Sequence, residues 1–535
     1  MAERFDYIIV GAGSAGCVLA NRLSADPRRR VLVLEAGGDD NWIWFHIPVG
    51  YLFSIGNPRA DWMFQTQPVP GLDGRVLAYP RGKVIGGSSA INAMIYMRGQ
   101  AADYDVWRDD LGLSGWGWDD VLPLFMAQED HIAPPGPLHA RGGEWRVEHP
   151  RMRWRVLEAF AEAAALEGIP TTDDFNSGDN FGAGYFQVNQ KAGWRWSAAR
   201  GFLKPVLRRP NLKLITGVQV SRVLIEDGRA VGVAWTRDGQ TFEARADGEV
   251  VLAAGAVGTP HILEHSGIGD AGRLSGAGLP TTHHRPGVGE NLRDHLQLRP
   301  YYRVTGVPTM NAHYASVWRR PLMALEYAAF RRGPMSMAPS QMGAFARSSP
   351  DQATPNLQFH VQPLSLERFG EALHAFPAIT ISVCNLRPTS RGSIHAAGPD
   401  AAAAPLIQPN YLSTAADEQV AIDSLRLVRR IVAQAPLQVF HPREHRPGPA
   451  ATTDADLLAA ARALGTTIFH PVGTARMGLA SDPAAVVDAR LRVYGLAGLR
   501  VADASVMPNI TSGNTNSPTM MIAEKAARMM IEDAR

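Results

Sequence analysis

Three glycines and one acidic residue near the N-terminus have the spacing of a dinucleotide-binding site. Gly11, Gly13 and Gly16 form a G-x-G-x-x-G motif, and Glu35 follows the third glycine by about 20 residues. Glycines at these places allow a tight turn and let the backbone approach a pyrophosphate, whose charge the free N–H groups of a helix N-terminus stabilise. The carboxylate of Glu35 is suited to accept hydrogen bonds from an adenosine ribose.

The elements that must position these residues are a strand, a helix and a second strand. Residues 7–10 form an apolar run before the motif, Val18, Leu19 and Leu23 follow it with helical spacing, and residues 31–34 form a second buried-strand run. This order predicts a Rossmann-like unit. Because the second strand ends in an acid, we expect an unphosphorylated ribose, so the ligand is FAD or NAD rather than NADP. This stretch does not choose between FAD and NAD.

The composition is that of a water-soluble globular protein with two domains or one elaborated domain. The chain has 535 residues, of which 45% are hydrophobic and 19% charged, and its net charge is +2. Without a polybasic field we expect no nucleic-acid partner. Cys17 and Cys384 are the only cysteines, so we expect neither disulfides nor a metal site. A strand so close to Met1 leaves no room for a signal peptide, and no apolar run approaches a bilayer span, so a cytoplasmic location is expected.

Residues 41–66 are rich in aromatic side chains and have neither helical nor strand periodicity. Trp42, Trp44, Trp62 and Phe64 lie here among glycines and prolines. Two interpretations stay open, namely an ordered excursion that packs on the first domain, or a lid over an apolar substrate.

A glycine- and serine-rich turn follows at Gly86, Gly87 and Ser88. Small residues and hydroxyl groups at this point suit close contact with a flat or anionic ligand. We expect the apolar run after the turn to be helical.

Five segments, in order along the chain, resemble the signature motifs of the glucose–methanol–choline (GMC) flavoprotein oxidoreductases. They are YPRGKVIGGSSAINAMIYMRG (79–99), GAVGTPHILEHSGIG (255–269), FHPVGTARMG (469–478), LRVADASVMP (499–508) and GNTNSPTMMIAEKAA (513–527). The resemblance covers nearly the whole chain and is strongest to the bacterial alcohol, polyethylene glycol and choline dehydrogenases of the family. It implies FAD as the cofactor and an alcohol as the substrate.

The expected fold is an α/β FAD-binding Rossmann-like domain interleaved with an α+β substrate domain built on an antiparallel sheet. LQFHVQP and AITISVCNLRP alternate like antiparallel strands, SLRLVRRIVAQAP reads as an amphipathic helix, and a last helix is expected from about residue 519 to 534. The FAD domain is expected at residues 1–155, with its excursion at 41–66, and at 196–299 and 461–535. The substrate domain is expected at residues 156–195 and 300–460.

The resemblance implies a catalytic pair, His470 and Asn514. Oxidation of an alcohol needs a base for the hydroxyl proton and an acceptor for the hydride, and the flavin N5 supplies the second. His470, between Phe469 and Pro471, is the expected base and is mostly neutral at pH 7. Asn514 is expected to donate a hydrogen bond to the alcohol oxygen, at a position where many relatives have a second histidine.

The motifs and the resemblance also imply a set of cofactor-binding residues, in which the backbone at Val220 meets the adenine. Relatives that attach FAD covalently have a histidine at the position of Ile91, so we expect the FAD to be non-covalent. The expected cofactor-binding residues are Gly11, Gly13, Ser14, Ala15, Gly16, Glu35, Ala36, Arg81, Gly86, Gly87, Ser88, Asn92, Ala93, Met94, Val220, Ala254, Gly255, Asp503, Ala504, Asn514 and Thr515.

The expected activity is oxidation of a primary alcohol to the aldehyde by an FAD-dependent dehydrogenase that passes electrons to a quinone, cytochrome or dye-like acceptor. Apolar or aromatic alcohols are expected to be better substrates than quaternary amines. One alternative is an oxidase that reduces O2 to H2O2, and another is a flavin-containing lyase of the same fold. An NAD-dependent dehydrogenase would leave the segments at 79–99 and 255–269 without a purpose.

One further segment, residues 318–332, combines arginines with large apolar side chains. Arg319, Arg320, Arg331 and Arg332 lie among large apolar side chains, namely Trp318, Leu322, Leu325, Tyr327 and Phe330. A solvated helix is the default interpretation of this pattern. The alternative is an interfacial helix that rests on a partner or on anionic lipid, which would place the protein peripherally at the inner face of the membrane.

Overall fold

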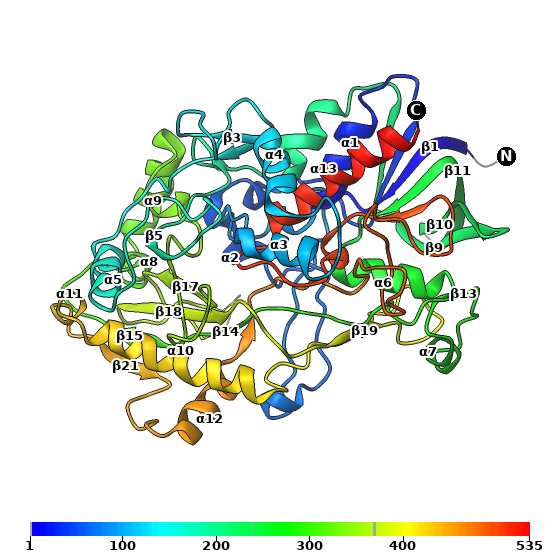
Figure 1. The fold of residues 1–535 in the computed structure, drawn as a ribbon. Coiled ribbons are helices and arrows are strands. Elements are labelled where there is room, and N and C mark those ends of the chain that lie inside the picture. The colour runs from blue at the N-terminus through cyan, green and yellow to red at the C-terminus, as the bar shows by residue number, and fades with distance from the viewer. Residues whose placement is uncertain (1–2, 238, 368–370, 535) are drawn as a thin grey trace.

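The computed structural model describes residues 3–237, 239–367 and 371–534, which form two large sheets with helices around them (Figure 1). The first and last described elements of the chain, β1 (Glu3–Val10) and α13 (Asn516–Asp533), lie at the first sheet. The helices are α1 (Ser14–Leu23), α2 (Tyr51–Ser54), α3 (Ala101–Asp109), α4 (Trp118–Gln128), α5 (Arg155–Leu166), α6 (Gly255–His265), α7 (Ala271–Gly276), α8 (Met310–Ala315), α9 (Arg319–Phe330), α10 (Ala415–Ala433), α11 (Ala435–Gln438), α12 (Asp454–Leu464) and α13 (Asn516–Asp533). None of these described helices is long and apolar enough to cross a membrane.

The first sheet has the strand order β8-β2-β1-β11-β10-β9, with β23 paired to β11. Its parallel part is buried on both faces, which explains the nearly continuous apolar runs at residues 7–10 and 31–34. The strands are β1 (Glu3–Val10), β2 (Val31–Glu35), β8 (Leu212–Thr216), β9 (Gln219–Glu226), β10 (Arg229–Arg237), β11 (Gln240–Leu252) and β23 (Leu499–Val501).

Helix α1 starts directly after the glycine motif and packs beside α13, so the two ends of the chain meet on this sheet (Figure 1). A side chain at Gly16 would place its Cβ 1.8 Å from the carbonyl oxygen of Gly11. Only glycine therefore lets α1 pack this closely on the turn.

The second sheet is antiparallel, with the order β21-β15-β18-β17-β16-β5, and β14 joins β18 to β22. Leu357, Phe359 and Val361 of β17 pack into the core with helices α5 and α10, and the alternate residues of β17 point to the opposite face. The strands are β5 (Gly182–Tyr185), β14 (Leu296–Leu298), β15 (Tyr301–Arg303), β16 (Met342–Ala346), β17 (Leu357–Gln362), β18 (Ala378–Asn385), β21 (Arg443–Arg446) and β22 (Thr466–Thr467).

Four further sheets of the described residues have two strands each and lie in the segments that connect the larger elements. Their strands are β3 (Glu129–His131) with β4 (Trp145–Val147), β6 (Gln190–Lys191) with β7 (Trp194–Arg195), β12 (Ile268–Gly269) with β13 (His283–His284), and β19 (Ser393–His395) with β20 (Leu406–Gln408).

The interleaving of two domains agrees with the expected architecture, while the domain boundaries stay a prediction. Strands β14 and β22, at residues 296–298 and 466–467, hydrogen-bond into the second sheet although both lie outside the range 300–460. The chain therefore crosses between the two sheets within a few residues of His470.

The prediction of a helix after the glycine–serine turn is wrong. A short 3-10 helix covers Gly87–Ala90, and residues 92–99 have no regular structure apart from an isolated bridge between Ile95 and Val188. Met94 has a φ of 61°, which a continuing α-helix cannot accommodate. The last helix begins earlier than the predicted start at about residue 519. It starts at Asn516 and holds Pro518 in its first turn, where proline is tolerated.

Candidate active site

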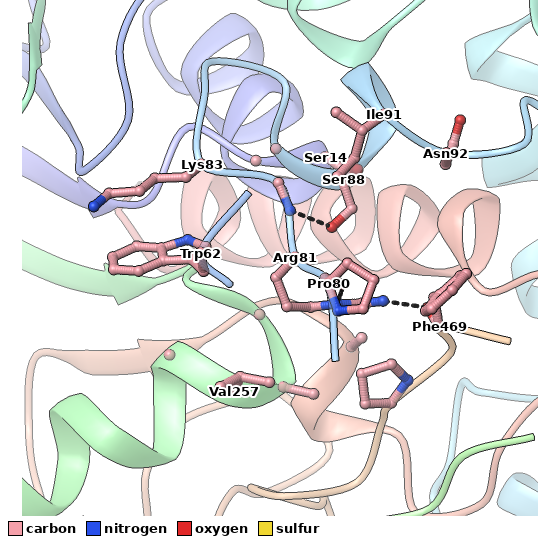
Figure 2. A pocket seen from close by; sticks show the side chains of 18 of the residues that line it. Ser14, Trp62, Pro80, Arg81, Lys83, Ser88, Ile91, Asn92, Val257 and Phe469 are labelled. Atoms are coloured by element: carbon pink, nitrogen blue, oxygen red, sulfur yellow. Dashed lines mark hydrogen bonds between the residues drawn. The ribbon is translucent and has the colours of Figure 1, made fainter. Parts of the chain in front are cut away.

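A deep pocket runs from the carboxyl ends of the first sheet to the polar face of β17, and Figure 2 shows part of its lining. Every expected cofactor-binding residue lines this pocket except Gly16 and Gly86. These two lie behind the wall, where Gly16 contacts the turn at Gly11 and the N–H of Gly86 donates to the carbonyl of Ala12. His470 and Asn514 line the same pocket.

The glycine motif and the glycine–serine turn meet at one point of the pocket wall. A Cβ at Gly87 would lie 2.7 Å from Cα of Gly13, so the two turns touch through bare backbone. Ser88 accepts a hydrogen bond from the N–H of Gly82, and the Arg81 side chain donates to the Phe469 carbonyl at 2.7 Å (Figure 2). The second contact ties the turn to the residue next to His470.

Two buried carboxylates in the first-sheet half of the pocket are held by backbone N–H groups. Glu35 accepts from the N–H groups of Ala12 and Gly37, both at 2.7 Å. Asp503 accepts from the N–H of Gly255 at 2.9 Å and from the Thr259 hydroxyl at 2.6 Å. Burial raises the pKa of both carboxyl groups. Exposed backbone, small side chains and a fixed acid at the end of β2 fit a dinucleotide cofactor.

The backbone around His470 is fixed by one buried acid. The carboxylate of Asp294 accepts from the N–H of His470 at 2.8 Å, and also from the hydroxyl groups of Tyr79, Tyr411 and Thr467. Burial raises the pKa of Asp294. These bonds set the position of the histidine before any ligand is considered.

A run of hydrogen bonds determines which nitrogen of His470 carries the proton. The Leu386 carbonyl, which can only accept, lies 3.2 Å from Nε2 of His295, so this nitrogen is protonated. Nδ1 of a neutral His295 is then an acceptor, and it lies 3.1 Å from Nδ1 of His470, which must donate. Nε2 of His470 is therefore left as the unprotonated nitrogen.

Asn514 completes this run of hydrogen bonds on the other side of His470. Its Oδ1 accepts from Nε2 of Gln358 at 3.1 Å, and its Nδ2 lies 3.1 Å from Nε2 of His470. The amide nitrogen therefore faces the imidazole lone pair, consistent with the tautomer set by His295.

Burial keeps all three histidines of this region neutral. It lowers the pKa of His470 well below the ordinary value, with further lowering by His295 and His360. Burial also lowers the pKa of His295 and of His360 to about 3. A neutral imidazole in a pocket whose Nε2 carries no proton can accept a proton from a ligand hydroxyl.

Sequence reasoning missed His295, His360 and the glutamines of β17. His360 and Gln362 line the pocket, and Gln358 holds Asn514. The alternation in LQFHVQ was a usable signal, because it places Gln358, His360 and Gln362 together on the face opposite to the apolar residues. No local signal identified His295, because its role depends on contacts with residues 91 and 175 positions away.

Comparison with protein families identifies this architecture. Residues 5–297 match the N-terminal model of the family described as GMC oxidoreductase, and residues 388–523 match its C-terminal model. The chain is a GMC oxidoreductase. It has the two-domain fold of the family, and FAD is its cofactor. The predicted family, fold class and cofactor are therefore confirmed.

Relatives of this GMC oxidoreductase span nearly its whole length. It is 41% identical over 530 residues to an alcohol dehydrogenase [acceptor] of Pseudomonas putida, covering 98% of this chain and 96% of the relative. It is 40% identical to the mitochondrial choline dehydrogenase of Mus musculus, covering 98% and 89%. The crystal structure of pyridoxine 4-oxidase from Mesorbium loti superposes with a TM-score of 0.89 at 34% identity and covers 98% of both chains.

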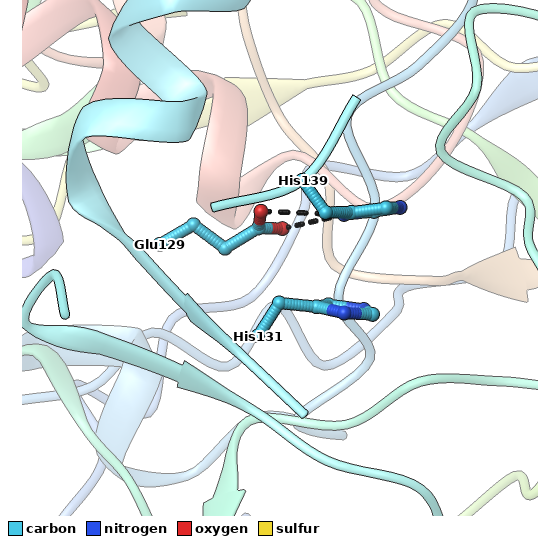
Figure 3. A group of neighbouring side chains, drawn as sticks. All are labelled: Glu129, His131 and His139. Atoms are coloured by element: carbon cyan, nitrogen blue, oxygen red, sulfur yellow. Dashed lines mark hydrogen bonds and ion pairs between the residues drawn. The ribbon is translucent and has the colours of Figure 1, made fainter. Parts of the chain in front are cut away.

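A separate group of potential metal ligands, Glu129, His131 and His139, does not line the pocket (Figure 3). Nδ1 of His139 lies 3.1 Å from Glu129, and its Nε2 lies 3.1 Å from Asp174. Burial lowers the pKa of His139, but its hydrogen bonds to Asp174 and Glu129 outweigh that effect and raise it to about 9. Arg98 also pairs with Glu129 at 2.8 Å. Two cations already neutralise these acids, so the charges oppose a metal ion.

Proposed function

We propose that this GMC oxidoreductase oxidises a primary alcohol to the aldehyde and passes the electrons to an acceptor other than O2. The observation that carries the proposal is the run of hydrogen bonds from Leu386 through His295 and His470 to Asn514, which leaves Nε2 of His470 as a proton acceptor in the pocket. Bound FAD supplies the acceptor for the hydride that leaves the alcohol carbon.

In this proposal Nε2 of His470 takes the hydroxyl proton and the Asn514 amide donates a hydrogen bond to the alcohol oxygen. Protonation makes His470 an imidazolium, whose Nδ1–H still donates to Nδ1 of His295. That hydrogen bond becomes charge-assisted and stronger, so it stabilises the protonated base. Asp294 holds the His470 backbone in place throughout.

The charges of the pocket disfavour a cationic substrate. Among the described residues that line it, the carboxylates are Glu35 and Asp503, and both are already held by backbone N–H groups in the first-sheet half. The half that contains His470 is lined by Tyr51, Ile55 and other groups without a carboxylate, and the Arg81 guanidinium lies there with a hydrogen bond to the Phe469 carbonyl. A quaternary ammonium ion would find no carboxylate there, so we propose apolar or aromatic primary alcohols as substrates, in contrast to choline.

A panel of alcohols tests this function, with each alcohol supplied once with a dye acceptor under argon and once with O2 alone. The proposal expects dye reduction with benzyl alcohol or a medium-chain alkanol and little H2O2. Absence of dye reduction with every primary alcohol would contradict it.

A second candidate is an oxidase that reduces O2 to H2O2. One observation favours it, namely the similarity to a structure described as pyridoxine 4-oxidase. In the same panel this candidate expects H2O2 to form with O2 alone at a rate comparable to the dye-coupled rate.

A further inference from the structure

Helix α9 presents an exposed apolar face at the end of the molecule away from both termini (Figure 1). Trp318 is 84% exposed, and Leu322 and Leu325 follow it at helical spacing on the same face with more than half of each side chain exposed. Tyr314, Val317 and Phe330 are also exposed nearby. These six residues are here called the α9 surface.

The α9 surface is held firmly on the protein from its opposite side. Tyr327, the one buried residue of α9, points away from Trp318 and belongs to the same buried cluster as Tyr51. Its hydroxyl donates to the carbonyl of Gly193 at 2.8 Å. The guanidinium of Arg331 stacks on Trp194, with 4.5 Å to the ring centroid. The apolar face is therefore presented by an anchored helix.

Basic side chains surround the α9 surface. Arg319, Arg320 and Arg332 are exposed, and Arg331 is half-buried at the end of the helix. The one acid in residues 310–333 is Glu326, which pairs with Arg332 at 3.1 Å. The rim of the apolar face is therefore positively charged.

The α9 surface adjoins the wall of the active-site pocket. Tyr51, which shares a buried cluster with Tyr327, lines the pocket, as does Ile55 just beyond α2. On its other side α9 contacts the turn at Pro334–Ser336, which leads to Pro339 and Ser340 in the pocket wall. The same short segments therefore contact both the helix and the pocket.

We propose that the α9 surface docks this enzyme on an anionic lipid bilayer. Tryptophan and leucine side chains with arginines beside them have the composition of an element that lies in the boundary between headgroups and acyl chains. A two-fold contact between copies would instead bring two arginine-rich rims together. The docking itself is argued from the α9 surface alone. Its benefit to the enzyme rests on the proposed function, because docking would bring the pocket near membrane-dissolved alcohols and a quinone acceptor.

Co-sedimentation with vesicles tests the docking. Binding to vesicles that contain phosphatidylglycerol is compared with binding to pure phosphatidylcholine vesicles, each at low and at high salt. One variant carries Trp318→Ser, Leu322→Ser and Leu325→Ser, and a second carries Arg319→Gln, Arg320→Gln and Arg332→Gln. A matched control changes two exposed apolar residues elsewhere, Leu166→Ser and Val439→Ser. Flavin absorbance and a cooperative thermal unfolding transition without vesicles confirm that each variant is folded.

The native enzyme and the control should co-sediment with anionic vesicles at low salt and much less with neutral vesicles. The serine variant should lose about tenfold or more of its binding under all conditions, and the glutamine variant should lose the salt-sensitive part. The docking is overturned if the native enzyme stays in the supernatant, or if both variants bind as well as the native enzyme. It is also overturned if the serine variant abolishes a dimer that forms without lipid.

The two proposals fail separately in this design. Vesicle binding without alcohol oxidation would overturn the proposed function and leave the docking supported. Dye-coupled oxidation without vesicle binding would overturn the docking and leave the proposed function supported.

Discussion

At His470 the direction of one hydrogen bond decides whether the ring can act as a base. A carbonyl at the far end, on Leu386, can only accept, and this fixes the proton positions on His295 and then on His470. A group some distance from the pocket thus determines the chemistry at the pocket surface.

Replacing His470 by Ala should leave FAD bound and lower kcat by about 10² to 10⁴ fold, the usual range for a lost general base. Flavin absorbance of the purified variant measures the retained FAD, and steady-state dye reduction measures kcat. An enzyme that keeps most of its turnover would rule out His470 as the base.

Replacing Asn514 by Ala should cost less, about 1 to 3 kcal/mol of transition-state stabilisation, because one neutral hydrogen bond to the alcohol oxygen is lost. The ratio of kcat/KM values gives this energy. A loss as large as that of His470→Ala would instead indicate that Asn514 also holds the base in place.

His295 is a positioning residue, and its removal should change the pH profile as well as the rate. In His295→Ala the Nδ1–H of His470 loses its acceptor, so kcat should fall by about tenfold or more and its acid limb should move. His295→Gln keeps an acceptor oxygen and should restore part of both. Equal pH profiles for all three enzymes would contradict the positioning role.

His139 should make stability depend on pH in the alkaline range. Its folded pKa of about 9 lies above the unfolded value of about 6.5, so its contribution is full below about pH 6.5 and disappears as pH rises through about 9. Thermal unfolding of the native enzyme should show this loss, and His139→Gln should show a smaller one. A Tm that rises strongly on adding zinc would instead support a metal site.

At the scale of elements, the sequence predicted what is locally encoded. The strands at 7–10 and 31–34 have continuous apolar runs, the two strands of the second sheet and helix α10 have clear periodicity, and each is present. The prediction of a helix after Ala90 is wrong. The apolar composition of this segment reflects burial at the pocket and not a helical face. The pairing of β14 with β18 and β22 is long-range and leaves no local pattern.

The aromatic segment at residues 41–66 brings Tyr51, Ile55, Trp62 and Phe64 to the pocket, and these residues underlie a prediction about substrates. Benzyl alcohol or a medium-chain alkanol should have a higher kcat/KM than choline, because apolar groups are removed from water and no carboxylate is present for a quaternary ammonium ion. Faster turnover of choline would reverse this order and indicate that the aromatic rings cage the cation.

At the scale of the whole molecule, residues from both ends of the chain form the cofactor half of the pocket. Ser14 of α1 donates to Asn516 of α13 at 2.6 Å, and Arg22 pairs with Glu524. The family motifs indicated this closure, since they run from one end of the chain to the other.

The FAD should be released when the protein is precipitated with acid, because the alkyl side chain of Ile91, which lines the pocket, cannot form a covalent bond to the flavin. Flavin absorbance in the supernatant measures the release. Yellow colour that stays in the precipitate would contradict non-covalent binding.

The most direct test of the proposed chemistry is rapid mixing of the enzyme with a primary alcohol in the absence of O2. The account predicts that the alcohol bleaches the flavin absorbance of the native enzyme, that His470→Ala bleaches about 10² to 10⁴ times more slowly, and that a dye restores the colour faster than air does. Bleaching of His470→Ala at the native rate, or no bleaching of the native enzyme by any primary alcohol, would contradict it.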